Sequence, residues 1–261
     1  MKKRLFRVLL FTAIGLAGQS GLLLSAPPKE PESRPLSTSD SADGTDREAH
    51  LRKGDIFTDG GYLKKGVWGV MEGVVDAPPK VVWRLFVQAN DWKYYKLPQL
   101  ADSRAVSEEV AKASVPLKKV EEFYKMLGER SFDPMDGQKP NAVWTNYTFQ
   151  YYDLPWPVSN KWIVLKNEND ETQSSKMIYR CSWEKSAGNV KTLSGDFRLE
   201  PFEGDPKRTF LHYRVETDPG SFVPKFLMKW GVKKSLPTAM RIIRRESAKL
   251  AARPSPILHT Q

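Results

Sequence analysis

Residues 192–217, TLSGDFRLEPFEGDPKRTFLHYRVET, contain the two clearest strand patterns of the chain. In both halves apolar residues alternate with charged or polar ones, which is typical of strands that bury one face and expose the other. The glycine- and proline-containing segment between the halves predicts a turn, and therefore an antiparallel pair. The buried face of this pair is predicted to carry Phe197, Leu199, Leu211, Tyr213 and Val215.

Upstream segments extend the pair into a larger sheet. Residues 143–152, 161–166 and 176–183 are rich in aromatic and β-branched residues, and each is predicted to form a strand. An earlier strand is predicted at 67–75, followed by a short helix that starts at two prolines. A second short helix is predicted at 116–127, between a proline and a glycine.

A long amphipathic helix is predicted near the end of the chain. Leu236, Met240 and Ile243 recur at helical spacing and form an apolar stripe, while Pro237 predicts a kink or a restart. The opposite face carries the bases Lys234, Arg241, Arg245 and Lys249. Since the sheet needs the apolar stripe, the basic face is expected to point to solvent, where it could dock on an anionic membrane surface.

The first 53 residues differ in composition from the rest. Residues 1–26 combine four bases with a following apolar run, which predicts a signal peptide or an uncleaved N-terminal anchor. Residues 27–53 are rich in Pro, Ser and acids and predict a disordered linker. The folded domain is then expected at 54–253, with a tail at 254–261, and the protein is expected to be exported to the periplasm or cell envelope.

The composition excludes several classes of site. The chain has one cysteine and three widely separated histidines, so we expect no disulfide and no metal site. Neither a phosphate-binding loop nor a dinucleotide fingerprint occurs, and no cofactor is expected. Residues 222–253 hold nine bases and one acid while the central body is nearly neutral, which argues against a nucleic-acid-coating protein.

Five ordered motifs carry a resemblance to a known superfamily. They are the segments 72–83 (EGVVDAPPKVVW), 97–104 (LPQLADSR), 154–161 (LPWPVSNK), 218–225 (DPGSFVPK) and 235–237 (SLP). Together they resemble the START-like lipid-binding superfamily, also known as SRPBCC or helix-grip proteins, and in particular bacterial-type START domains. Lys161 and Trp162 depart from the family pattern, which usually has Arg-Asp at these positions.

The resemblance implies an α+β helix-grip fold, in which a curved antiparallel sheet wraps around a long C-terminal helix. It also implies an apolar tunnel between sheet and helix that binds a lipid or other hydrophobic molecule. The candidate ligand-binding residues are Tyr147, Phe149, Tyr151, Phe197, Leu199, Leu211, Tyr213, Val215, Phe226, Trp230 and Met240. We expect a monomer that binds and transfers such a ligand without catalysis.

Two other functions stay open at this level. Cyclases and dehydratases share this fold, and Glu72 or Glu184 could act as acid or base in a cyclase-like or hydrolase-like enzyme if either faced the cavity. His212 is expected on the outer face of the sheet, and Cys181 is expected to be a small buried hydrophobe. The basic helix could instead bind protein or RNA, although the export signal argues against RNA.

Overall fold

The computed structural model describes residues 43–97, 99–153, 159–218 and 225–252, with side chains described for 46–97, 99–153, 159–218 and 234–252. Its strands form one antiparallel sheet in the order β1-β2-β8-β7-β6-β5-β4-β3. They are β1 Phe57–Tyr62, β2 Val67–Val75, β3 Leu100–Val106, β4 Val143–Tyr152, β5 Lys161–Asp170, β6 Tyr179–Gly188, β7 Thr192–Phe202 and β8 Asp205–Asp218. The predicted meander is confirmed, and β2 and β4 have the predicted bounds.

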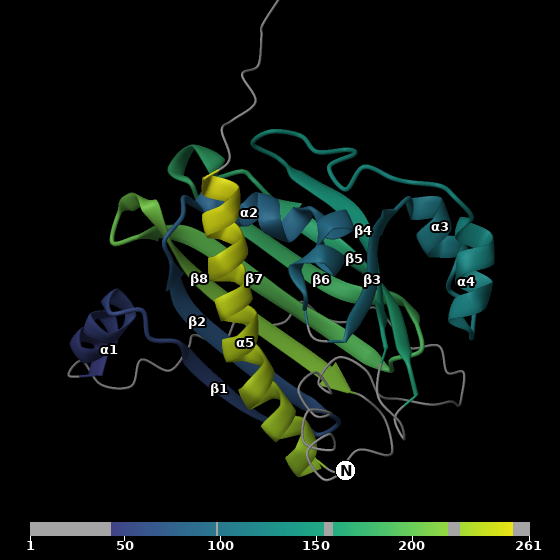
Figure 1. Ribbon diagram of the computed structural model, residues 1–261, viewed down its shortest axis with the longest axis horizontal. Helices are drawn as coiled ribbons and strands as arrows, with labels where there is room; N and C mark the ends of the chain where they lie inside the picture. Colours follow the sequence, from purple (N-terminus) through teal and green to yellow (C-terminus); the bar gives the residue numbers. More distant parts are fainter. Residues whose placement is uncertain (1–42, 98, 154–158, 219–224, 253–261) are drawn as a thin grey trace, which may run out of the picture.

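Helices lie in front of the sheet and at its sides (Figure 1). They are α1 Asp43–Arg52, α2 Pro79–Val87, α3 Glu108–Ala113, α4 Val120–Leu127 and α5 Lys225–Ala251, with 3-10 turns η2 Ala89–Tyr95 and η3 Ser174–Lys176. The buried side chains place α2 and α5 on one face of the sheet and α1 and α4 on the other. The long helix α5 lies across the concave face, α1 lies beside β1 and β2, and α3 and α4 lie beside β3 and β4 (Figure 1). The α+β helix-grip fold is therefore confirmed.

The long helix α5 packs closely on β2 at a glycine. A Cβ atom at Gly73 would lie 2.6 Å from Cε of Met240, so the end of the Met240 side chain rests on the backbone of the strand. One turn further along α5, the Arg244 guanidinium donates to the carbonyls of Val74 and Gly54, each at 2.8 Å. These contacts fix the helix over the first two strands.

The outer face of the sheet has an apolar cluster of its own. Phe123 of α4 stacks on Phe149 of β4 at 4.2 Å between ring centroids, and Trp162 of β5 lies 5.7 Å from Phe123. All three side chains are buried. Strands β4 and β5 are thus covered by the cavity and α5 on one side and by α4 on the other.

The linker prediction is wrong for residues 43–52, because these residues form the helix α1, Asp43–Arg52. Leu51 is buried against the outer face of the sheet, and Arg47 pairs with the Glu72 carboxylate of β2. The folded part therefore begins before residue 54. The predicted signal or anchor, the linker up to residue 42 and the tail at 254–261 lie outside the described residues.

Two further details differ from the sequence prediction. The second short helix begins at Val120 rather than near residue 116, and α3 precedes it. Pro237 does not restart the helix, since α5 runs without interruption from Lys225 to Ala251. Within the described part of the chain, no helix combines the length and the hydropathy that crossing a bilayer requires.

Candidate functional site

A cavity of about 180 Å³ lies between the concave face of the sheet, α5 and the α2–η2 segment. A single water needs only about 10–15 Å³ by this measure, so the space is large enough for a small-molecule ligand. The helical walls of the cavity are formed by Leu85, Phe86, Val87, Trp92, Tyr95, Ser235, Leu236, Ala239, Ile242 and Ile243. The apolar side chains that the sheet and Leu97 contribute are Met71, Leu97, Leu100, Leu165, Trp183, Leu193, Phe197 and Val215.

Aromatic stacking shapes one end of this cavity. Phe86 of α2 stacks on Phe197 of β7 with 4.2 Å between ring centroids. Trp183 of β6 lies 5.2 Å from the ring of Tyr213 on β8. The indole of Trp183 covers Gly195, where any Cβ atom would overlap it. The ring of Trp183 can therefore lie flat against β7 only because residue 195 has no side chain.

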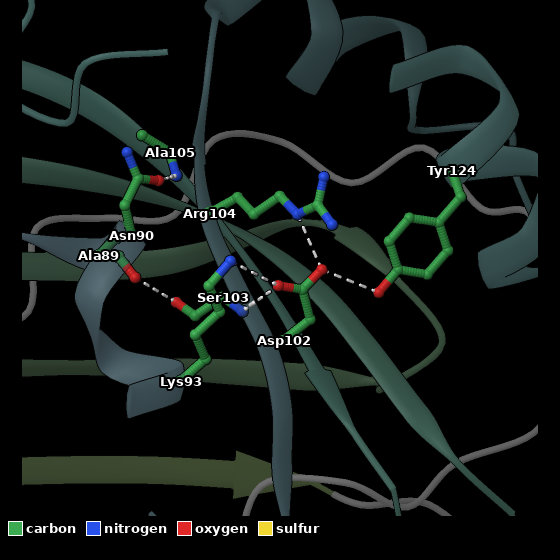
Figure 2. Close-up of polar contacts among 8 residues, drawn as sticks. All are labelled: Ala89, Asn90, Lys93, Asp102, Ser103, Arg104, Ala105 and Tyr124. Atoms are coloured by element: carbon green, nitrogen blue, oxygen red, sulfur yellow. Dashed lines mark hydrogen bonds and ion pairs between the residues drawn. The ribbon is translucent and has the colours of Figure 1, made fainter. Parts of the chain in front are cut away.

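The η2 wall is fixed to β3 by polar contacts (Figure 2). The Ser103 hydroxyl donates to the Ala89 carbonyl at 2.7 Å, and the Ala105 amide donates to the Asn90 side chain at 2.7 Å. These two hydrogen bonds attach the start of η2 to β3. Trp92 and Tyr95, further along η2, line the cavity.

On the opposite side of β3, Asp102 connects the strand to α4 (Figure 2). Its carboxylate accepts from Arg104 at 2.8 Å and from the Tyr124 hydroxyl at 3.1 Å, and Lys93 of η2 lies 3.6 Å away. Burial, together with the Asp102 charge, raises the pKa of Tyr124 well above its ordinary value. The Tyr124 hydroxyl therefore stays protonated and can donate to Asp102.

A band of uncharged polar side chains crosses the sheet wall of the cavity. Strand β4 contributes alternate residues, and β5 and β8 add others. The polar lining consists of Asn146, Thr148, Gln150, Tyr152, Asn167, Asn169 and Tyr213. Burial raises the pKa of the Tyr152 hydroxyl, and Tyr213 raises it further.

The lone cysteine also faces this cavity. Cys181 of β6 is 6% exposed, as the sequence predicts for a small buried hydrophobe. Burial raises the pKa of its thiol far above the ordinary range, which disfavours the thiolate. Among the residues that the structure describes, no three His, Cys, Asp or Glu side chains group as metal ligands would.

The structure brings part of the predicted ligand-binding set together. Phe197, Tyr213 and Val215 line the cavity. Leu199, Leu211 and Met240 belong to the same buried core but lie outside the cavity lining. The predicted residues Phe226 and Trp230 lie on α5 in the part of the helix whose side chains are not described.

The prediction for β4 is wrong, because Tyr147, Phe149 and Tyr151 point away from the cavity. They pack in the outer cluster with α4 and Trp162. The residues between and beside them, Asn146, Thr148, Gln150 and Tyr152, face the cavity instead. Alternation predicts two faces for this strand and favours the more apolar face as the cavity wall, but α4 also requires an apolar partner.

The candidate catalytic carboxylates also lie outside the cavity. Glu72 faces the outer side of β2, where it pairs with Arg47 and accepts from the His212 ring at 2.9 Å. Burial would raise the pKa of Glu72, but His212 and Arg47 outweigh burial and lower it. Glu184 is exposed and lines a charged depression on the outer face. His212 lies on the outer face as predicted.

The predicted basic face of α5 is exposed at all four positions. Arg245 donates to Glu246 at 2.5 Å and to the carbonyl of Tyr95 in η2 at 2.6 Å. Lys249 also donates to Glu246, at 3.1 Å. The basic face is therefore continuous with η2, which is itself a wall of the cavity.

Sequence reasoning missed two features, one in the cavity wall and one in the core beside it. The polar band was visible as Asn146, Thr148 and Gln150 alternating with aromatic residues, but nothing in the sequence said which set faces inward. The second is Glu171, whose carboxylate accepts from the indoles of Trp83 and Trp144 at 3.1 and 2.9 Å. Residues that far apart in sequence carry no local pattern that would connect them.

Comparisons with known proteins agree with this architecture. No protein-family model matches the chain. An uncharacterized protein of Pseudomonas aeruginosa is 30% identical over 88 residues, which cover 31% of this chain and 43% of that protein. The match therefore spans less than half of that relative's length.

Among solved structures, a STAR-related lipid transfer protein from Xanthomonas axonopodis aligns with a TM-score of 0.52 at 15% identity. The alignment covers 74% of this chain and 93% of that one. The Zhui aromatase/cyclase from a Streptomyces species aligns with a TM-score of 0.44 at 12% identity, covering 75% and 95%. The first of these likenesses agrees with the START-like fold that the sequence motifs predict.

Proposed function

We propose that this START-like chain binds a lipid or other hydrophobic small molecule in the cavity beneath α5 and carries it between membranes. The observation that carries the proposal is the cavity itself, which is enclosed by aromatic and aliphatic side chains with a few polar groups on one wall. Such a composition is typical of small-molecule sites. Native mass spectrometry of the purified chain, followed by organic extraction, would identify a co-purifying ligand.

Filling the cavity from α5 is expected to abolish binding. Ala239 lines the cavity, so the Ala239→Phe substitution would place a ring in the space the ligand needs. We expect the affinity for the neutral fluorescent probe N-phenyl-1-naphthylamine to fall at least tenfold, as measured by fluorescence titration. The cavity has room for the ring, so the thermal midpoint should change little.

Ala248→Phe is the matched control, because Ala248 is exposed on the same helix. This variant should bind the probe like the wild type. Equal affinities of the two variants and the wild type would place the probe elsewhere and contradict the proposal. Failure of the wild type to bind any apolar probe would do so as well.

We further propose that the basic face of α5 docks on an anionic membrane, and that the protein is exported to meet such a membrane. The support is charge: four exposed bases share this face, with one acid, Glu246, between two of them. The adjoining η2 adds Tyr94, which is 70% exposed, and the residue after η2, Lys96, is also exposed. Each base near an anionic surface contributes about 1 kcal/mol, so docking is expected to be weak and reversible.

Neutralising the basic face is expected to reduce vesicle binding and its salt dependence. The test variant of the full chain changes Lys234, Arg241, Arg245 and Lys249 to Gln. Cosedimentation with vesicles containing phosphatidylserine should fall several-fold relative to the wild type, because electrostatic attraction is lost. Using the full chain in both samples keeps any contribution of the N-terminal segment constant.

A second variant with the same change in net charge tests whether position matters. It changes the exposed lysines Lys64, Lys65, Lys118 and Lys125 to Gln. We expect this variant to sediment like the wild type. Equal losses in the two variants, or binding of the wild type that does not weaken as salt rises, would rule out docking through this face.

A further inference from the structure

The cavity wall formed by β4 and β5 presents polar side chains where apolar ones were available. On β4 the aromatic side chains of Tyr147, Phe149 and Tyr151 point outward. Asn146, Thr148 and Gln150 point into the cavity from the same strand. A buried amide costs free energy unless it forms hydrogen bonds, so this orientation needs partners for the amides.

Some of these partners are provided by the protein. Asn146 accepts from Asn169 at 3.1 Å and donates to the Pro134 carbonyl at 2.9 Å. The Gln150 side-chain oxygen accepts from the Tyr152 hydroxyl at 2.5 Å. Asn146 therefore has both a donor and an acceptor contact within the fold, and its role in the wall is structural.

Other groups on the same wall still have hydrogen-bonding capacity. Among the described residues, the structure gives no partner to the Tyr213 hydroxyl, the Gln150 side-chain nitrogen or the Asn167 side-chain oxygen. The Asn167 nitrogen makes only long contacts of 3.4 Å with Asn146 and Thr148. One hydroxyl, one donor and one acceptor thus face the cavity from three strands.

These groups are all uncharged, and the opposite walls are mainly apolar and include the uncharged Ser235 of α5. A charged ligand group would lose its hydration on entering the cavity and would find no opposite charge on this wall. Burying an unpaired charge in this way is strongly unfavourable. A neutral hydroxyl, carbonyl or amide would instead find both donors and acceptors.

We propose that the cavity selects an uncharged amphiphile. Its hydrogen-bonding head lies against Tyr213, Asn167 and Gln150, and its apolar body lies against α5 and the aromatic end. This inference rests on the proposed function, since it names the chemical class of ligand for the same cavity.

The test compares three probes with chains of ten carbons. 1-Decanol, decanoate and 1-decene are titrated against the full chain loaded with N-phenyl-1-naphthylamine at pH 8, where the carboxylate is ionised. We expect 1-decanol to displace the dye at least tenfold more strongly than decanoate. In Tyr213→Phe and Asn167→Leu, the affinity for 1-decanol should fall three- to tenfold while that for 1-decene stays within twofold.

Tyr179→Phe is the matched control, because Tyr179 is buried in the same core but does not line the cavity. It should leave all three affinities unchanged, and thermal unfolding of each variant checks its folding. Displacement by decanoate as strong as by 1-decanol would overturn the inference. So would equal losses for 1-decanol and 1-decene in Tyr213→Phe and Asn167→Leu. Neither result contradicts the proposed function. If none of the three probes displaced the dye, both the inference and the proposed function would be overturned.

Discussion

Replacing Glu171 with alanine is expected to lower the free energy of unfolding by about 3 kcal/mol. The Glu171 carboxylate is 6% exposed and accepts from the indoles of Trp83 and Trp144 and from the side chain of Gln138 at 2.6 Å. Alanine would leave two buried indole N–H groups without an acceptor, and each costs about 1–3 kcal/mol. Urea denaturation followed by tryptophan fluorescence and circular dichroism measures the change.

Two variants separate the carboxylate's charge from its position. Glu171→Gln keeps an oxygen acceptor and is expected to cost about 1 kcal/mol, because hydrogen bonds to a charged acceptor are stronger than those to a neutral one. Glu168→Ala removes an exposed carboxylate from the adjoining end of β5 and should change stability by less than about 0.5 kcal/mol. A loss in Glu171→Ala no larger than in Glu168→Ala would show that the indoles do not depend on this carboxylate.

The Glu171 contacts also matter for the cavity. Trp83 belongs to α2, and its ring stacks on Tyr179 of β6 at 5.3 Å between centroids. Glu171 lies next to the end of β5, so its hydrogen bonds connect α2, β4 and β5. Since α2 forms part of the cavity wall, we expect substitution of Glu171 to make α2 more mobile as well as to lower the stability of the protein.

Gly195→Ala is expected to destabilise the protein by about 2–3 kcal/mol and to abolish ligand binding. A Cβ atom at residue 195 would overlap both the indole of Trp183 and the carbonyl oxygen of Arg214 on the neighbouring strand. The backbone oxygen cannot move without disturbing the β7–β8 pairing, and the indole can only move toward the cavity. Denaturation and titration with N-phenyl-1-naphthylamine measure the two effects.

Ser194→Ala controls for a change at the neighbouring position. Ser194 is exposed on the outer face of the same strand, so alanine there should leave stability and probe binding unchanged. A Gly195→Ala variant with the stability and affinity of the wild type would mean that Trp183 does not need the space above Gly195. If Gly195→Ala bound the probe more weakly but kept the stability of the wild type, the overlap with the new methyl group would be relieved entirely by movement of the Trp183 indole.

The sequence alone determined the architecture of this protein. The period-two alternation of 196–200 and 209–217 predicted two strands, and the structure contains β7 and β8 there, with Phe197 and Tyr213 on the cavity side. The apolar stripe on the last helix predicted its packing on the sheet, and Met240 lies against Gly73. These features are local, because the spacing of apolar residues fixes which face of a strand or helix must be buried.

Only the tertiary structure decided which face of β4 lines the cavity. Alternation identifies two faces, but it names the buried one only when the other faces water. On β4 both faces are covered, and α4 takes the aromatic row around Phe149, which leaves Thr148 and Gln150 to face the cavity. For the same reason the sequence could not reveal Glu171, because its partners Trp83 and Trp144 approach it only after α2, β4 and β5 have packed together.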